Sequence, residues 1–291
     1  MTGAAAGSGV GAARAARFAI RKLSPAIGAE IVGVDLAQEL DADTFARIRA
    51  AWHARNILLF RDQRLSEADQ VRFAARFGEL APVINRHDGV GGHPSVMLVS
   101  NIRKDGKPIG ALPDGEMLFH SDQCYVERPC MATMLYAIEL PSAGGHTLFA
   151  DMYAAFATLP EAVKRGIAGL KALNVYDYAG RPTSRARSPA ADAPAFAHPV
   201  VRTHPATGRQ ALYVNRLMSG HIVGLARAES DALLARLFEH QEQRRFVYEH
   251  VWRAGDLILW DNRCTLHART DFDPGERRLL RRVAIRGERP E

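Results

Sequence analysis

The apolar residues of this chain follow the two-residue alternation of β-strands in most segments and the helical period in only a few. Residues 18–35 alternate in this way and contain Gly28 and Gly33, which predicts strands joined by a tight turn. Residues 56–60 are almost wholly apolar and are predicted as a short buried strand. Further strands are expected at residues 131–140, 146–150, 200–203, 210–214, 257–260 and 280–286.

Helical periodicity is clearest in residues 43–54, where apolar side chains recur every three to four positions. Ser66 and Asp69 have the spacing of a capping box, so a second helix is expected to begin there and to end at Gly78. Further helices are expected at residues 152–169 and 228–243, and irregular segments at residues 82–118 and 179–198.

Many short strands and few helices favour a mainly β fold with helical decoration, in which antiparallel strands form a jelly-roll core. A chain of 291 residues can bury a substantial core without disulfides. No internal repeat or linker divides it, so residues 18–291 are expected to form a single domain. Residues 1–17 are small, flexible and basic, and a disordered leader is expected there.

Charge and composition narrow the class of protein. Lysine and arginine outnumber acidic residues by 38 to 32, which gives a net charge of +6. The chain has no helix-turn-helix, zinc-finger or aromatic RNA-binding signature, so acidic small molecules are expected as partners and nucleic acid is not. No apolar run is long enough to span a membrane. Cys124, Cys130 and Cys264 lack the spacing of a zinc site or a disulfide framework, which favours a reducing, cytoplasmic setting.

A candidate metal site begins with the His-x-Asp sequence of His120 and Asp122, whose side chains would share one face of a strand. Such a pair also arises by chance in a chain with eleven histidines. His267, which follows the predicted strand 257–260 and a turn, supplies a third candidate ligand. Two histidines and one carboxylate on one face of iron(II) leave three adjacent positions open, as in non-haem oxygenases. A structural zinc site would instead close all four positions.

A basic cluster follows the third candidate ligand. Arg278 and Arg282 are four residues apart in a predicted strand, so their side chains share a face. Arginines beside a metal could bind a dicarboxylate through paired hydrogen bonds. Taken alone, the cluster favours an interpretation as surface charge.

With these residues in place, the sequence resembles the taurine dioxygenase and 2,4-dichlorophenoxyacetate dioxygenase family of iron(II)/2-oxoglutarate enzymes. The matching segments occur in the family's order and cover nearly the whole chain after residue 18. They are residues 27–35 (IGAEIVGVD), 58–63 (LLFRDQ), 73–80 (FAARFGEL), 119–122 (FHSD), 141–149 (PSAGGHTLF), 201–208 (VRTHPATG), 260–267 (WDNRCTLH) and 277–282 (RRLLRR).

The resemblance implies a double-stranded β-helix, which is a jelly roll, and a dioxygenase that uses iron(II), 2-oxoglutarate and O2. Iron would be bound by His120, Asp122 and His267, while Thr147 and Arg278 would hold the distal carboxylate of 2-oxoglutarate. The implied reaction hydroxylates a small organic substrate and converts 2-oxoglutarate to succinate and CO2. The family is commonly dimeric or tetrameric, so a homo-oligomer is expected.

The resemblance also bears on the substrate. Taurine enzymes place a His and a Tyr where this chain has residues 81–86 (APVINR), which argues against taurine. Residues 201–204 and 260–264 look closer to the phenoxyacetate branch, so a small anionic substrate with a carboxylate, such as a phenoxy acid, is favoured over a sulfonate. By the same resemblance, Arg282 would lie near the metal-bound carboxylate and the anionic group of the substrate. The basic candidates for binding the substrate are Arg86, Lys104, Lys107, Arg202 and Arg282.

Two other classes of function stay open as alternatives. A zinc-dependent hydrolase could use the same three ligands to activate water, although it would not need Thr147 or the paired arginines. A non-catalytic jelly-roll binding protein would have no reason to retain an open iron site. Residues 103–118 are either a lid over the substrate or an ordinary surface loop. The sequence does not determine the primary substrate or the roles of His146, His204 and Cys124.

Overall fold

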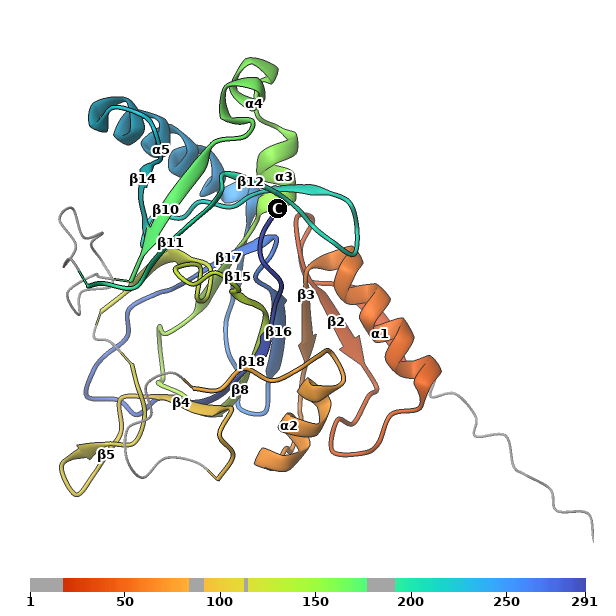
Figure 1. Ribbon diagram of the computed structural model, residues 1–291. Helices are drawn as coiled ribbons and strands as arrows, with labels where there is room; N and C mark the ends of the chain where they lie inside the picture. The colour runs from red at the N-terminus through yellow and green to blue at the C-terminus, as the bar shows by residue number, and fades with distance from the viewer. Residues whose placement is uncertain (1–17, 84–91, 113–114, 177–191) are drawn as a thin grey trace, which may run out of the picture.

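The structure of the protein is a computed structural model that describes residues 18–83, 92–112, 115–176 and 192–291 (Figure 1). The described chain is mainly β, with a few helices, as the hydrophobic pattern predicts. The predicted leader, residues 1–17, and the candidate Arg86 lie outside the described residues.

Two sheets hold most of the strands. The larger sheet has the order β1-β2-β3-β16-β8-β18-β4 and is antiparallel except for the pair β2–β3. The smaller sheet has the antiparallel order β15-β9-β17-β7. Their bounds are β1 Ala19–Lys22, β2 Ala29–Val32, β3 Ile57–Phe60, β4 Val96–Ser100, β7 Met117–His120, β8 Cys130–Glu139, β9 Thr147–Asp151, β15 Val247–His250, β16 Leu257–Asp261, β17 Thr265–Arg269 and β18 Leu279–Arg286.

Smaller elements surround these sheets. Helices α1 and α2 lie beside β2 and β3, whereas α3, α4 and α5 gather at another side of the molecule with the sheet β11-β10-β14 (Figure 1). The remaining bounds are α1 Ala42–Arg55, α2 Glu67–Ala75, α3 Met152–Ala157, α4 Glu161–Ile167, α5 Arg227–Gln241, β5 Arg103–Lys104, β6 Lys107–Pro108, β10 Lys171–Val175, β11 Ala195–Pro199, β12 Val201–Thr203, β13 Gln210–Leu212 and β14 Ser219–Ile222.

The central strands β3 and β16 of the larger sheet are buried on both faces, which explains why their side chains are largely apolar. Leu58 of β3 faces a core cluster shared with α1 and α2. Ile57 and Trp260 face the opposite way, into a cluster that includes Phe149 of the smaller sheet. The next residue of that sheet, Ala150, packs with α3 and α5. The two sheets therefore pack face to face, with helices outside each.

Local signals place the first two helices close to their predicted positions. Asp41 precedes α1 and accepts a hydrogen bond from the backbone N–H of Thr44, and Asn56 ends the helix in the left-handed region at φ 65°. Ser66 and Asp69 form the predicted capping box at the start of α2.

Three expectations were wrong in detail. The helix predicted at residues 152–169 is two helices, because Pro160 lacks the N–H that a continuous helix requires at that point. The segment predicted as irregular, residues 82–118, contains strand β4 and the hairpin β5–β6, and residues 179–198 include most of β11.

In the described part of the chain, no helix combines the length and the apolar character that crossing a membrane requires.

Candidate active site

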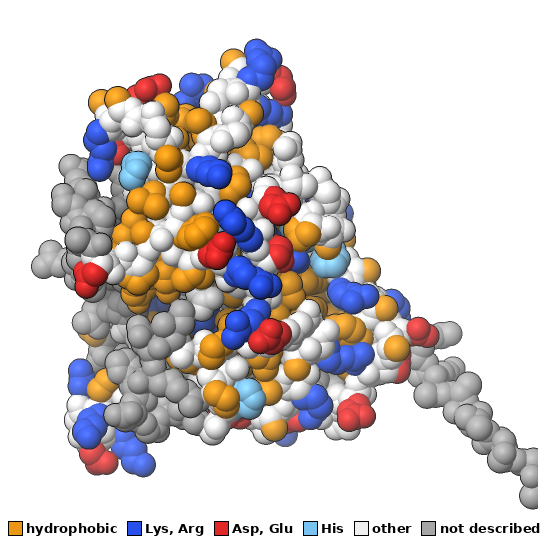
Figure 2. Space-filling model, viewed as in Figure 1, with side chains coloured by type: hydrophobic (Ala, Val, Ile, Leu, Met, Phe, Trp, Pro, Cys, Tyr) orange, Lys and Arg blue, Asp and Glu red, His pale blue; other side chains and the backbone are white. Residues whose placement is uncertain are grey.

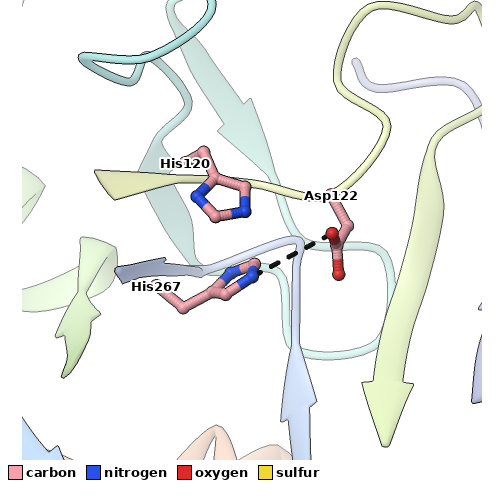
Figure 3. A group of neighbouring side chains, drawn as sticks. All are labelled: His120, Asp122 and His267. Carbon is pink, nitrogen blue, oxygen red and sulfur yellow. Dashed lines mark ion pairs between the residues drawn. The ribbon is translucent and has the colours of Figure 1, made fainter. Parts of the chain in front are cut away.

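Three side chains with metal-binding atoms meet at one end of the smaller sheet. Strands β7 and β17 pair with His120 directly opposite His267, and the two imidazole rings lie with their centroids 4.0 Å apart. Asp122 lies in the turn just after β7, so the expectation that it shares a strand face with His120 is wrong. Its Oδ1 is nevertheless 4.0 Å from Nε2 of His267 (Figure 3). One atom from each of the three side chains falls within 4.8 Å of the others.

The protonation states of these side chains are those that a metal requires. Burial, and then the neighbouring His120, lowers the pKa of His267 to about 3, and burial also lowers the pKa of His120. For Asp122, burial alone would raise the pKa, but the Arg282 guanidinium and the histidines hold it well below its usual range. Both imidazoles are therefore neutral and the carboxylate is ionised at neutral pH, as metal ligands must be.

Hydrogen bonds leave one atom of His120 and one atom of Asp122 directed at the centre. Nδ1 of His120 is 2.9 Å from the carbonyl oxygen of Leu118, so this nitrogen donates and Nε2 is free to bind a metal. The Oδ2 atom of Asp122 accepts from the Thr133 hydroxyl at 2.6 Å and from Arg282 at 2.9 Å. Its Oδ1 atom faces His267.

Asn262 supports this arrangement from the turn between β16 and β17. Its amide nitrogen donates to the Thr133 hydroxyl at 3.0 Å, which leaves the hydroxyl proton for Asp122. Its amide oxygen accepts from the indole of Trp260 at 2.9 Å. The Trp260 ring also lies tilted against that of His267, with the centroids 4.8 Å apart.

The three side chains open onto a cavity of about 480 Å³ between the two sheets. The polar part of the lining is formed by residues of β9, β17 and β18. The apolar part is formed by β4, by residues near β7 and by two tyrosines. The polar lining contains Thr147, Arg269, Arg278 and Arg282, and the apolar lining contains Pro82, Val83, Met97, Val99, Leu112, Met117, Tyr125, Tyr176 and Met218.

Arg278 is a buried arginine of the cavity lining. It is only 1% exposed, and its guanidinium makes one hydrogen bond to the described residues, from Nη2 to the carbonyl of Gly145 at 3.2 Å. Its Nε and Nη1 atoms find no hydrogen-bond partner among the described residues. Burial, and then the charge of Arg269, lowers the pKa of Arg278 to about 9. A buried cation without a counter-ion is costly, so this position calls for an anion.

Thr147 is close to this arginine. It begins β9 directly after the turn that contains Gly145. The indole of Trp252 donates to the Thr147 hydroxyl oxygen at 3.0 Å, so the hydroxyl proton is free to bind an anion. Thr147 and Arg278 both line the cavity, as the sequence predicts.

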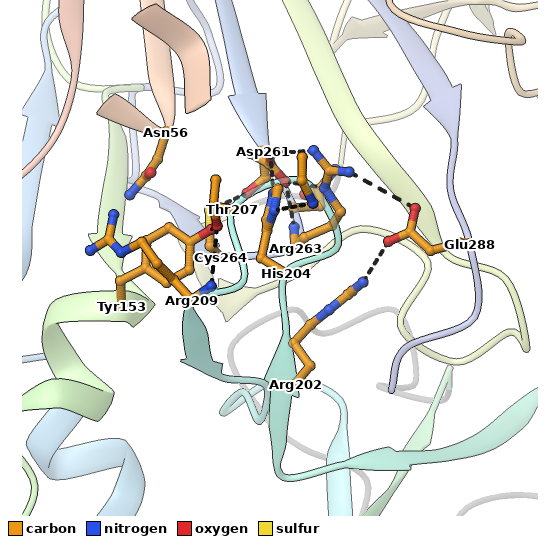
Figure 4. A network of polar contacts seen from close by, with 12 residues as sticks. Asn56, Tyr153, Arg202, His204, Thr207, Arg209, Asp261, Arg263, Cys264 and Glu288 are labelled. Carbon is orange, nitrogen blue, oxygen red and sulfur yellow. Dashed lines mark hydrogen bonds and ion pairs between the residues drawn. The ribbon is translucent and has the colours of Figure 1, made fainter. Parts of the chain in front are cut away.

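The other basic candidates lie elsewhere. Lys104 and Lys107 face each other on the exposed hairpin β5–β6, and neither lines the cavity. Arg202 is buried, but it pairs with Glu288 at 2.8 Å and also lies outside the cavity lining (Figure 4). The structure thus gives these three residues no place at the site, and Arg282 alone remains of the described candidates. Nothing in the local sequence signals that Glu288, 86 positions later, neutralises Arg202.

Arg269 is a buried cavity residue that the sequence analysis missed. It lies on β17 two positions after His267, so both side chains face the same way. That two-residue spacing from a proposed ligand was the signal that could have identified it.

The three residues whose roles the sequence left open have structural partners. His146 pairs with Glu249 at 2.8 Å. Cys124 is buried and contacts the sulfur of Met218 at 3.4 Å. His204 donates to Asp261, whose carboxylate also binds Arg263 at 2.7 Å (Figure 4).

His204, Asp261 and Cys264 form a second group of possible metal ligands. Both carboxylate oxygens of Asp261 already accept hydrogen bonds from Arg263, and Oδ2 accepts a further one from His204. Burial, and then the charge of Asp261, raises the pKa of the Cys264 thiol. This group is therefore a structural polar network.

Comparison with known proteins relates most of the chain to one family. Residues 19–284 match the family described as "Taurine catabolism dioxygenase TauD, TfdA family". The α-ketoglutarate-dependent 2,4-dichlorophenoxyacetate dioxygenase of Cupriavidus pinatubonensis is 34% identical over 276 residues, which is 90% of this chain and 95% of the relative. The α-ketoglutarate-dependent sulfate ester dioxygenase of Pseudomonas putida is 34% identical over 91% of this chain and 88% of the relative.

Solved structures agree with these sequence relationships. The crystal structure of AAD-2 in complex with Mn(II) and N-oxalylglycine is 29% identical and superposes with a TM-score of 0.77 over 94% of this chain and 99% of the other.

On the face seen in Figure 2, basic side chains are interspersed with acidic ones.

Proposed function

The chain belongs to the TauD/TfdA family of 2-oxoglutarate-dependent dioxygenases, and from this premise we propose that it hydroxylates a small anionic organic substrate. The hydroxylation is coupled to conversion of 2-oxoglutarate to succinate and CO2. The observation that carries the proposal is the buried guanidinium of Arg278, which has no carboxylate partner among the described residues and lines the same cavity as His120, Asp122 and His267.

The architecture proposed for this function is a jelly roll formed by residues 18–291 as a single domain. The face-to-face packing of the seven-stranded and four-stranded sheets supports it. The predictions of a homo-oligomer and of a cytoplasmic location stay predictions.

We assign iron(II) to His120, Asp122 and His267. Two neutral imidazoles and one ionised carboxylate form a donor set that suits iron(II), and no cysteine belongs to the group. When bound, iron(II) together with 2-oxoglutarate and O2 supplies the oxidising chemistry. The protein fixes the ligands: Thr133 and Arg282 hold Oδ2 of Asp122 so that Oδ1 is presented to the metal.

The polar lining of the cavity is assigned to 2-oxoglutarate. Arg278 and the free hydroxyl proton of Thr147 would bind the distal carboxylate and remove the cost of the buried cation. Arg282 reaches the metal-bound side of the site through its ion pair with Asp122, and would stabilise the carboxylates gathered there. A zinc hydrolase or a non-catalytic binding protein would have no use for this anion site beside an open metal site.

The apolar lining of the cavity is assigned to the organic part of the substrate. Its thioether, aliphatic and aromatic side chains would bind an apolar body, exclude water and orient one C–H bond toward the metal. Relatives act, by their names, on 2,4-dichlorophenoxyacetate and on sulfate esters. The phenoxyacetate relative and the departure from the taurine pattern at residues 81–86 support a carboxylate such as a phenoxy acid over a sulfonate.

Anaerobic spectroscopy tests the metal and co-substrate assignments. Addition of iron(II) and 2-oxoglutarate should produce a weak visible charge-transfer band in the wild-type protein. The band should vanish in His120→Ala and persist in His146→Ala, whose histidine pairs with Glu249 and does not line the cavity. Absence of the band in the wild type, or its persistence in His120→Ala, would contradict the assignment.

Substrate-dependent formation of succinate tests the substrate class. Phenoxy acids and other carboxylates should accelerate succinate formation more than sulfonates or sulfate esters of similar size. A larger acceleration by the sulfonates would overturn the preference while leaving the dioxygenase assignment intact.

A further inference from the structure

Arg269 lines the cavity but has no role in the site as assigned above. Its side chain is 7% exposed and lines the cavity on the same strand face as His267. In the pairing of β17 with β9, Arg269 lies directly opposite Thr147. Side chains of directly opposed residues in an antiparallel pair lie on the same face, with Cβ atoms about 5 Å apart. Arg269 is therefore a close neighbour of the hydroxyl assigned to the distal carboxylate.

Arg269 and Arg278 also approach each other around one aromatic ring. The guanidinium carbon of Arg269 lies 5.6 Å from the centroid of Phe272, and that of Arg278 lies 5.8 Å from the same centroid. The lowered pKa of Arg278 has the charge of Arg269 as a cause, second only to burial. Two positive charges are therefore concentrated next to Thr147, where a single anionic group would bind.

We propose that Arg269 is a second guanidinium of the co-substrate site, which acts with Arg278 and Thr147 on the distal carboxylate of the 2-oxo acid. This inference rests on the proposed function. Two cations around one carboxylate increase the selectivity for a dicarboxylate over a 2-oxo acid that ends in a methyl group, because only the charged end gains from both.

Arg269 also has a contact on its other side, since its Nη2 atom donates to the carbonyl of Gly115. This contact offers a purely structural alternative, in which Arg269 serves only to fasten the chain at Gly115 to β17. The two roles predict different binding behaviour. Loss of a fastening would weaken all ligands of the cavity alike, whereas loss of a carboxylate ligand would weaken only those with a distal carboxylate.

The test compares 2-oxoglutarate with 2-oxopentanoate, which has the same carbon chain and a methyl group in place of the distal carboxylate. Binding to the Mn(II)-loaded protein is measured by calorimetry, with competition by N-oxalylglycine for the weaker ligand. Arg269→Met should weaken binding of 2-oxoglutarate by about tenfold or more and change that of 2-oxopentanoate by less than about twofold. Arg269→Lys should recover part of the loss.

Arg277→Met is the matched control, because Arg277 is exposed, pairs with Glu139 and lies outside the cavity. It should leave both affinities unchanged. Arg269→Gln provides a second variant of different shape if the Met variant does not fold. An unchanged ratio of the two affinities in Arg269→Met and Arg269→Gln would overturn the inference. Failure of the wild-type protein to bind 2-oxoglutarate at all would instead overturn the proposed function.

Discussion

Asp122 illustrates how few residues decide the chemistry of the centre. One of its carboxylate oxygens is bound by Thr133 and Arg282, so only the other is available to a metal. Thr133 can donate because Asn262 occupies the acceptor side of its hydroxyl. A carboxylate constrained in this way binds a metal through one oxygen and leaves neighbouring positions open for a co-substrate.

Thr133→Val removes the hydroxyl with little change of volume, and we expect it to weaken metal binding by about tenfold or more. Thr133→Ser keeps the donor and should retain most of the affinity. Competition with a chromophoric chelator for Mn(II) measures both variants. Equal affinities of the Val variant and the wild type would show that Arg282 alone positions the carboxylate.

His198 makes a second prediction at the scale of one residue. It is buried and donates from Nε2 to the carbonyl of Val126 at 2.9 Å, and burial lowers its pKa from 6.5 to about 4. As the pH falls from about 6.5 to about 4, the unfolded chain binds a proton here and the folded chain does not. The free energy of unfolding must therefore decrease as the pH falls across that range, by up to about 1.4 kcal/mol per pH unit for one group.

Because glutamine can donate the same hydrogen bond and does not titrate, His198→Gln should reduce this acid-side slope by one proton. Urea unfolding at several pH values between 4 and 7 measures the slope. Identical slopes in the variant and the wild type would contradict the assignment to His198.

At the scale of elements, the turn between β8 and β9 determines where the co-substrate residues lie. Gly144 and Gly145 both have positive φ, at 74° and 63°. A Cβ on Gly144 would overlap the carbonyl oxygen of Asp271, and one on Gly145 would lie 3.1 Å from Nε of Arg278. The turn therefore packs directly against the segment that leads to Arg278.

Gly144→Ala should lower stability by about 1–3 kcal/mol, because it combines a strained φ with a clash against backbone that cannot move aside. Gly208→Ala is the control, since it has a similar φ of 68° but no neighbouring atom within 4 Å of its Cβ. Chemical denaturation should give a larger loss for Gly144→Ala. Equal losses would mean that strain alone, without the clash, accounts for the effect.

The elements that the sequence predicted correctly are those with local causes. The apolar runs of β3 and β16 and the caps of α1 and α2 depend on neighbouring residues, and the pattern reports them. Strands such as β10 and β15 were missed, because their burial depends on partners distant in sequence.

The same distinction applies to the site. His120, Asp122, His267, Thr147 and Arg278 were identified through motifs, and the structure brings them to one cavity. The choice among basic candidates failed, because charge alone does not reveal which arginine already has a carboxylate partner. Arg202 has Glu288, whereas Arg278 has none among the described residues.

At the scale of the whole molecule, ligands that bind only the folded state should stabilise it. By the proposed assignments, metal and 2-oxoglutarate together would connect β7, β9, β17 and β18 at the cavity. At one hundred times the dissociation constant, a ligand adds about 2.7 kcal/mol, which corresponds to a rise in Tm of about 4 °C for a chain of this size.

Differential scanning fluorimetry with Mn(II), alone and with 2-oxoglutarate, measures these increments. Arg278→Met should keep the increment from Mn(II) and lose the one from 2-oxoglutarate. Loss of both increments would mean that Arg278 is required for the metal site itself, contrary to its assigned role.

The two kinds of lining residue have a consequence for how such a protein evolves. The polar lining lies on strands that have a neighbour on both sides, where most changes would also damage the fold. Many apolar lining residues lie on the edge strand β4 or outside strands, such as Leu112 and Tyr125. Drift at those positions can alter which molecule is oxidised while the oxidising apparatus is inherited intact. Such a protein can therefore change its substrate in a few substitutions and stay an active oxygenase at each step.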